Sequence, residues 1–80
     1  MPIDMNLANE NRVTGAVTAY LSGRQNIDWA MSQIQGINIK PERLHELIET
    51  TIEALASLDV MKDKPVTAMG NELLTRLKLH

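Results

Sequence analysis

Apolar residues recur along most of this chain at intervals of three and four, which is the spacing that places side chains on one face of an α-helix. In the first stretch they are Val13, Ala16, Val17, Tyr20 and Leu21. Asn6 or Asn9 can cap the start of such a helix, and Gly23 can end it in the left-handed conformation. The pattern predicts a first helix over residues 8–22.

A second, shorter helix is predicted over residues 26–35. Asn26 supplies a side-chain cap at its start, and Gly36 offers the left-handed conformation that ends helices. Its apolar face consists of Ile27, Ala30, Met31 and Ile34. Two short helices in succession indicate a helical hairpin.

The third stretch carries the strongest pattern. Pro41 suits the first turn of a helix, and the apolar seam that follows has strict four-three spacing. The seam comprises Leu44, Ile48, Thr51, Leu55 and Leu58. This pattern predicts a helix over residues 41–60, about 30 Å long. Because that length is comparable to the diameter of a globule of this size, we expect a long central helix.

A fourth helix is predicted over residues 65–79, beginning at Pro65. Gly70 lies on its apolar face, where a glycine lets another helix approach closely. Between the second and third helices, residues 37–39 are too few to establish a strand by periodicity. We expect a loop whose isoleucines, Ile37 and Ile39, fill the core, and a short strand is the alternative.

Composition supports an all-α fold. The 80 residues are 44% hydrophobic but include no Phe, one Trp and one Tyr, so the core must be aliphatic, as in helix bundles. There is no Cys, so neither disulfides nor thiolate-bound metal can stabilise so small a core. We predict a single helical domain over residues 1–80, with four helices, that associates as a homodimer.

Charge and hydropathy indicate where the protein is located and which classes of partner it can attract. The net charge of −2 gives no general attraction to nucleic acid or to an anionic membrane. No apolar run approaches the roughly 20 residues that span a bilayer, and the first residues lack the features of a secretory signal. We expect a cytoplasmic protein without membrane association.

No motif points to catalysis. Glu42 and His45 have the Glu-x-x-His spacing of di-iron helical bundles, but Glu42 is on the outer face of its helix and no second carboxylate occupies a core position nearby. Glu46, Glu49 and Glu53 continue an acidic stripe, which is typical of a solvated helix face, with a basic partner as the alternative. The four glycines are scattered singly, unlike a nucleotide-binding loop. We predict no enzyme, no cofactor and no metal site.

Residues 37–43, INIKPER, have the outline of a short strand that enters a helix, and in this they resemble ribbon-helix-helix repressors. The resemblance implies a dimer whose paired strands lie in the major groove, with Asn38, Lys40 and Arg43 as DNA contacts. Repressors of this type, however, have a longer basic strand and a shorter first helix than the one predicted over 41–60. A dimeric DNA-binding regulator is therefore the alternative hypothesis.

Trp29 lies away from the apolar face of its helix, beside polar residues. On the reverse side of the first helix, Ala8, Gly15 and Ala19 form a row of small residues. An indole left in water forgoes roughly 2–3 kcal/mol of burial, and such rings are typical interface anchors. We predict that these four residues form an interface between two chains.

Burial of Trp29 by residues of its own chain is equally consistent with the sequence. Residues 1–7 contain three apolar side chains that could fold over Trp29, namely Ile3, Met5 and Leu7. Whether the chain itself or a second chain covers the indole is therefore open.

The function most consistent with these patterns is that of a small non-enzymatic interaction or regulatory protein. We expect it to bind a protein partner, as a homodimer. A structural subunit of a larger assembly is a third possibility, and it predicts an oligomer larger than a dimer.

Overall fold

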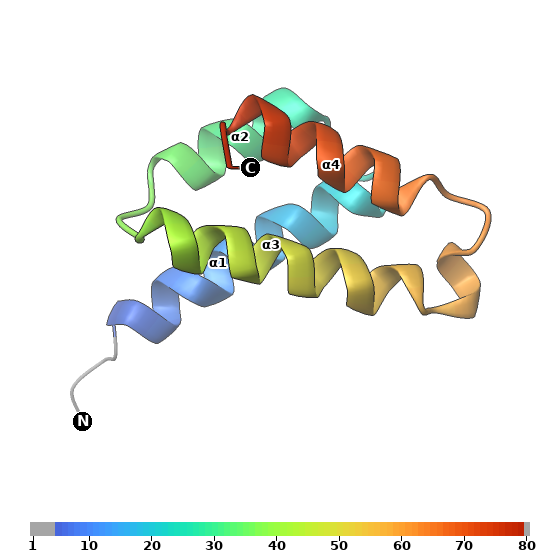
Figure 1. Cartoon of the computed structure of the whole chain (residues 1–80), viewed down its shortest axis with the longest axis horizontal. Coiled ribbons are helices and arrows are strands. Elements are labelled where there is room, and N and C mark those ends of the chain that lie inside the picture. The colour runs from blue at the N-terminus through green and yellow to red at the C-terminus, as the bar shows by residue number, and fades with distance from the viewer. Residues whose placement is uncertain (1–4, 80) are drawn as a thin grey trace.

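The protein is an assembly of four helices and contains no strand among the residues that the structure describes, which are residues 5–79 of a computed structural model. The helices are α1 (Met5–Leu21), α2 (Ile27–Gln35), α3 (Pro41–Ala56) and α4 (Val66–Arg76) (Figure 1). A short 3-10 helix, η1 (Asp59–Met61), lies between α3 and α4. The predicted all-α fold is confirmed.

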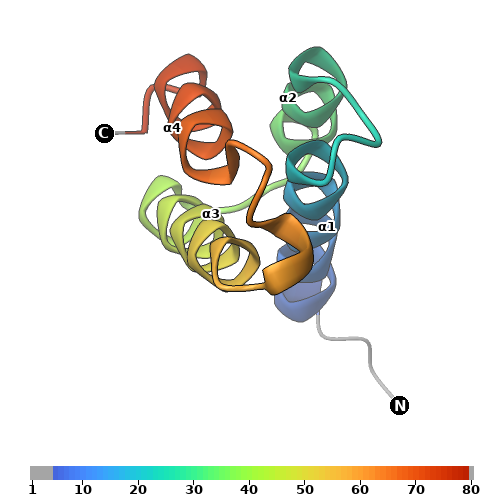
Figure 2. The ribbon, with the colours of Figure 1, turned by 90° about the vertical axis from the view of Figure 1, so that its right-hand side faces the viewer.

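The helices form two layers. α1 and α3 lie side by side in one layer, α2 turns back over α1, and α4 turns back over α3 (Figure 2). The interior is aliphatic, as the composition predicts. Its largest fully buried side chains are Val13, Val17, Leu21, Ile34, Ile48 and Leu73.

α1 ends at Leu21, within one residue of the predicted end, but begins earlier than predicted. Gly23 has φ +85°, its N–H donates to the Tyr20 carbonyl, and the N–H of Arg24 donates to the Ala19 carbonyl. These two bonds complete a left-handed helix stop. The predicted start at residue 8 is wrong, because the helix already includes Met5. The predicted caps are wrong for the same reason, since Asn6 and Asn9 both lie inside the helix.

α2 ends at the predicted residue and begins one residue later than predicted, at Ile27. The Asn26 side chain accepts a hydrogen bond of 2.8 Å from the N–H of Trp29, which is the expected N-cap. Gly36 follows the last helical residue but has φ −82°, so the predicted left-handed conformation there is wrong. Its N–H instead closes the last turn by donating to the Ile34 carbonyl.

α3 is shorter than predicted. Ile48 and Thr51 of the seam are buried, but the helix ends at Ala56 and Leu58 is 47% exposed, so the prediction of a helix to residue 60 is wrong. The chain leaves the helix axis and folds back so that Met61, only 7% exposed, enters the core. A continued helix would carry Met61 further along the axis, away from the rest of the protein.

α4 begins close to the predicted position and packs tightly on α3. A Cβ atom placed on Gly70 would lie 2.3 Å from Ile52 Cδ1, so the predicted close approach at Gly70 is confirmed. The prediction of a helix to residue 79 is wrong, because α4 ends at Arg76. The connection before α3 contains no strand, and its Ile37 is buried while Ile39 packs against the core, as the loop interpretation predicts.

The buried hydroxyl of Tyr20 joins α1 to α4. Tyr20 Oη, in a side chain that is 5% exposed, donates a hydrogen bond of 3.1 Å to the carbonyl of Met69. Burial raises the pKa of Tyr20, Glu72 adds to the rise and Arg76 opposes it. The protonated phenol is therefore the form that the fold favours.

Candidate functional site

A depression lined mainly by aliphatic residues lies where three segments that are distant in the sequence come together. We call it the apolar cleft. It encloses about 430 Å³ at the end of the molecule where α2 and α4 finish and α3 begins (Figure 1). Its lining comprises Ile34, Gln35, Ile37, Ile39, Pro41, Leu44, Arg76, Leu77, Lys78 and Leu79.

The stop of α4 places its last apolar residues in this cleft. Lys78 has φ +60°, its N–H donates to the Thr75 carbonyl, and the N–H of Leu79 donates to the Leu74 carbonyl. This is the same left-handed stop as at the end of α1, with lysine in the position that usually holds glycine. The turn sends Leu79 back to the core, where it is half-buried, and leaves Lys78 exposed.

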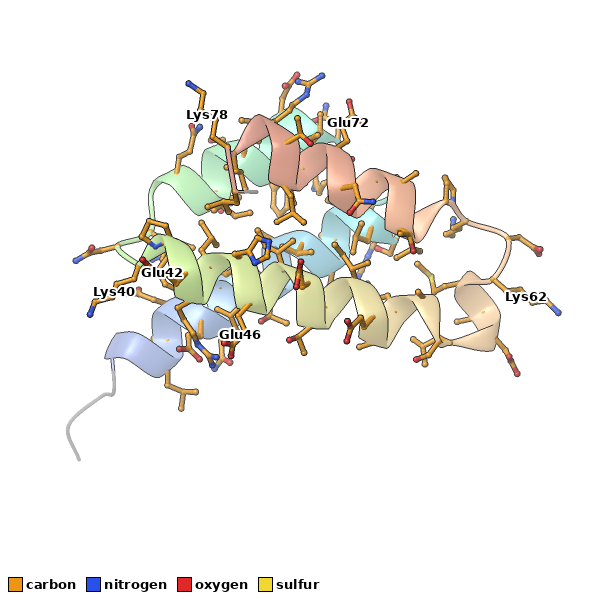
Figure 3. The ribbon with its side chains drawn as sticks, viewed as in Figure 1. Lys40, Glu42, Glu46, Lys62, Glu72 and Lys78 are labelled. Carbon is orange, nitrogen blue, oxygen red and sulfur yellow. The ribbon has the colours of Figure 1, made fainter. Side chains whose placement is uncertain are left out.

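The edge of the apolar cleft carries cations. Arg76 forms ion pairs with Asp28 of α2, at 3.6 Å, and with Glu72 of its own helix, at 3.5 Å. Lys78 has no ion pair within residues 5–79 and extends into solvent (Figure 3). Glu42 lines a neighbouring shallow depression together with Lys78 and Leu79. A ligand in the cleft would therefore meet an aliphatic floor with one unpaired ammonium group at its edge.

A second, polar cleft of about 410 Å³ lies beside the first, between the start of α1 and the start of α3. Arg43 bridges the two helices, donating to both Glu10 oxygens at 2.8 and 2.7 Å, and it also pairs with Glu46. These hydrogen bonds lower the pKa of Glu10 and raise that of Arg43. The Asn9 side chain donates to the Asn38 carbonyl at 3.0 Å, which ties the connection to α1.

The structure thus brings together the three residues considered as DNA contacts. Asn38, Lys40 and Arg43 all line the polar cleft, but two carboxylates already engage the guanidinium of Arg43. Lys40 is exposed and lacks an ion pair within the described range. The cleft therefore offers a nucleic acid one cation that is not neutralised, and DNA binding stays a prediction.

The predicted interface residues are placed on α1 and α2. Gly15 is exposed, with nothing within 4 Å of an added Cβ, while Ala8 and Ala19 are half-buried. Trp29 is also half-buried and packs against the core of its own chain. The chain itself therefore covers part of the indole, and the role of Trp29 as an interface anchor stays a prediction.

The position of Trp29 on α2 explains this cover. Asp28, which pairs with Arg76 of α4, and Trp29 lie on opposite sides of the buried stripe formed by Ala30 and Ile34. Because α4 is on the Asp28 side of α2, Trp29 lies on the side of α2 that is turned away from α4. The single chain therefore covers part of the indole through helix packing.

The alternative cover of Trp29 by residues 1–7 falls partly outside the described residues. Ile3 and the side chain of Met5 lie outside the described part of the structure. Leu7 is 55% exposed at the start of α1, far from the end of α1 where α2 begins. Leu7 therefore does not cover the indole.

The residues weighed for metal binding have other contacts. His45 Nε2 lies 3.2 Å from a carboxylate oxygen of Glu49, and Glu42 is exposed. Across residues 5–79, no three His, Cys, Asp or Glu side chains come together in a way that could hold a metal ion.

None of the four helices, as far as residues 5–79 define them, has the length and apolar character required to cross a lipid bilayer. Comparison with protein-family models, with curated proteins and with solved structures finds no significant match for this chain.

The apolar cleft was not apparent from the sequence. Ile37 and Ile39 lie outside the predicted helices, but Leu77 follows Leu73 by four residues and so continues the apolar face of the helix predicted over 65–79. Only the end of α4 at Arg76 places Leu77 and Leu79 outside a helix, where they line the cleft.

Proposed function

We propose that this chain is a non-catalytic interaction protein that regulates or assembles a protein partner by binding an aliphatic segment of it in the apolar cleft. The observation that supports the proposal is the lining of the cleft, where aliphatic side chains from three separate segments meet at the surface beside an unpaired cation. Contiguous apolar surface on a small protein marks interaction sites.

The chemistry of the cleft favours a peptide segment over a small polar ligand. Only Gln35, Arg76 and Lys78 contribute polar side chains to the lining, and Arg76 is engaged by two carboxylates. An amphipathic helix or turn supplies aliphatic side chains for such a floor and carboxylates for its basic edge, as in other helix-in-groove complexes. The expected partner segment is therefore aliphatic and acidic.

Nuclear magnetic resonance titration tests the proposal directly. The probe is a synthetic amphipathic peptide with a row of leucines and flanking glutamates, and the control peptide has the same composition in scrambled order. We expect saturable shifts of the amide signals of Ile37, Leu44, Leu77 and Leu79 with the first peptide only. Absence of saturable shifts, or shifts confined to the outer face of α1 around Gly15, would overturn the proposal.

A matched pair of variants sharpens this test. Lys78→Glu reverses the unpaired charge at the cleft edge, and it should weaken binding of the acidic peptide roughly fivefold, since charged contacts of this kind contribute about 1 kcal/mol. Arg12→Glu makes the same charge change on an exposed part of α1 that lies outside the cleft lining. Equal weakening by both variants would indicate a general effect of charge instead of binding at the cleft.

A nucleic-acid role has one observation in its favour, the common location of Asn38, Lys40 and Arg43 in the polar cleft. Sequence-specific DNA recognition needs side-chain donors that are free to reach base edges. Because Glu10 and Glu46 engage Arg43, this arrangement supports the protein-binding proposal more than the DNA-binding one.

A further inference from the structure

The connection between α3 and α4 presents an aliphatic tip. Val60 is 82% exposed and Leu58 is 47% exposed, with Asp59 between them. We call residues 58–60 the apolar tip. Among the side chains of residues 7–79, no large apolar one is as open to solvent as Val60.

The apolar tip is held in a defined shape. Met61 anchors it in the core with 7% exposure, and its N–H donates to the Leu58 carbonyl at 3.0 Å. The N–H of Lys62 donates to the Asp59 carbonyl, and the N–H of Lys64 donates to the Met61 carbonyl. A segment with this many local hydrogen bonds is already ordered, so binding through it would lose little conformational entropy.

The apolar tip and the apolar cleft lie at opposite ends of the molecule. α3 connects them, with Pro41 lining the cleft and Ala56 leading into the tip. Figure 3 shows Lys62 extending from the tip end, while Lys78 extends from the end that carries the cleft. One chain therefore cannot insert its own tip into its own cleft.

We infer that the occupant of the apolar cleft is the apolar tip of a second copy of this chain. Leu58 and Val60 would fill the aliphatic floor, and Asp59 between them would face Lys78 at the edge. The exposed charges next to these groups also complement each other, because Lys62 follows the tip and Glu42 lies beside Lys78. This inference rests on the proposed function of the cleft, and it specifies the partner as the chain itself.

The geometry of such a contact determines the kind of assembly. The two surfaces are different and lie at opposite ends, so the contact is head-to-tail and each added copy leaves one tip and one cleft free. The contact area is small, which places the association at the weak end of the range for protein interfaces. We expect oligomers that grow with protein concentration instead of a closed twofold dimer.

Sedimentation velocity on the full chain over a wide concentration range tests this inference. We expect the average mass to rise continuously up to millimolar concentration. Val60→Asp should weaken the association at least roughly tenfold without affecting the fold, because Val60 is exposed. Gln25→Asp, in the exposed connection between α1 and α2, is the matched control and should associate like the natural chain. A chain that stays monomeric throughout, or an unchanged association of Val60→Asp, would overturn the inference.

A mixing experiment distinguishes a head-to-tail contact from any other. Val60→Asp disables the tip but retains the cleft, whereas Lys78→Glu impairs the cleft but retains the tip. Each variant alone should be largely monomeric, and an equimolar mixture should form a one-to-one pair that does not grow further. If the mixture behaves as the sum of its components, the tip and the cleft are not partners.

Failure of the self-association inference can be distinguished from failure of the proposed peptide-binding function. If the synthetic acidic peptide binds at the cleft while the chain itself remains monomeric, the cleft is a binding site for another protein and only the self-association is overturned. If the chain self-associates and Lys78→Glu has no effect on either process, the cleft itself is not the site.

Discussion

Two glycines inside helices should respond in opposite ways to the same substitution. At Gly70, an added methyl group would lie 2.3 Å from Cδ1 and 2.4 Å from Cγ1 of Ile52, whose side chain is buried between α3 and α4. At Gly15, on the open side of α1, an added methyl group would meet nothing within 4 Å. Replacement by alanine therefore tests the close approach of α3 and α4 while holding the chemistry constant.

The expected change in the free energy of unfolding combines a steric cost with a gain in helix propensity. Carbon atoms settle at about 3.5–4.0 Å, so Ile52 or the α4 backbone must move by more than about 1 Å. Overpacking of this kind costs about 3 kcal/mol at the upper end of its usual range, and alanine regains about 1 kcal/mol of helix propensity. We expect Gly70→Ala to lower the free energy of unfolding by about 2 kcal/mol and Gly15→Ala to raise it by about 1 kcal/mol. For a domain of this size these changes shift Tm by about 4–8 °C per kcal/mol.

Urea denaturation followed by circular dichroism measures both variants, and a double-mutant cycle identifies the cause. Ile52→Ala removes Cγ1 and Cδ1 and leaves Cβ 3.6 Å from the new methyl group, which is ordinary contact. In that background Gly70→Ala should stabilise the protein, which corresponds to a coupling of about 3 kcal/mol. If Ile52→Ala is too unstable to measure, Ile52→Val removes Cδ1 alone and should relieve part of the clash. Stabilisation by Gly70→Ala equal to that by Gly15→Ala would show that the helices do not approach closely there.

Four further predictions address the caps, the buried phenol and the alternative functions. Asn26→Ala should lower the free energy of unfolding by about 1 kcal/mol through loss of the α2 cap, measured by urea denaturation, and an unchanged value would refute that role. Because the folded state raises the pKa of Tyr20, this phenol loses its proton at a lower pH in the unfolded chain than in the folded one, and the free energy of unfolding should fall as pH rises from about 10. Tyr20→Phe should remove this pH-dependent fall, and an equal fall in both proteins would contradict the prediction. Trp29→Ala should cost about 2 kcal/mol of packing yet keep the mass found by light scattering, whereas a smaller mass would show that Trp29 anchors a dimer. A gel-shift series with duplex DNA should give only weak, salt-sensitive binding, and a specific shift lost in Lys40→Ala would instead support a DNA-binding regulator.

Local signals in the sequence identified most helix boundaries. Asn26 caps α2, Gly23 ends α1 and Pro41 opens α3, as predicted. Each of these depends on one hydrogen bond or one backbone angle within a few residues, so neighbouring sequence is sufficient to specify it. The same holds for the buried faces of the helices, which follow from a periodicity of 3.6 residues.

Two boundary errors arose where a distant contact competes with a local signal. The seam of α3 continues to Leu58, but the chain leaves the helix so that Met61 can enter the core. Asparagine is a favoured residue for a helix cap, but the Asn9 side chain donates a hydrogen bond to the carbonyl of Asn38, which is 29 residues away. In both cases the competing partner is not adjacent in the sequence, so no local pattern reveals it.

The candidate site belongs almost entirely to the tertiary structure. The sequence by itself placed Ile37 and Ile39 in a connection between helices, but it placed Leu77 and Leu79 inside the fourth predicted helix. Only the packed structure brings the two pairs together beside Leu44 to form a cleft. The physical reason is that periodicity fixes which face of a helix is buried, whereas the rotation and offset of one helix against another are set by the packing of the whole core.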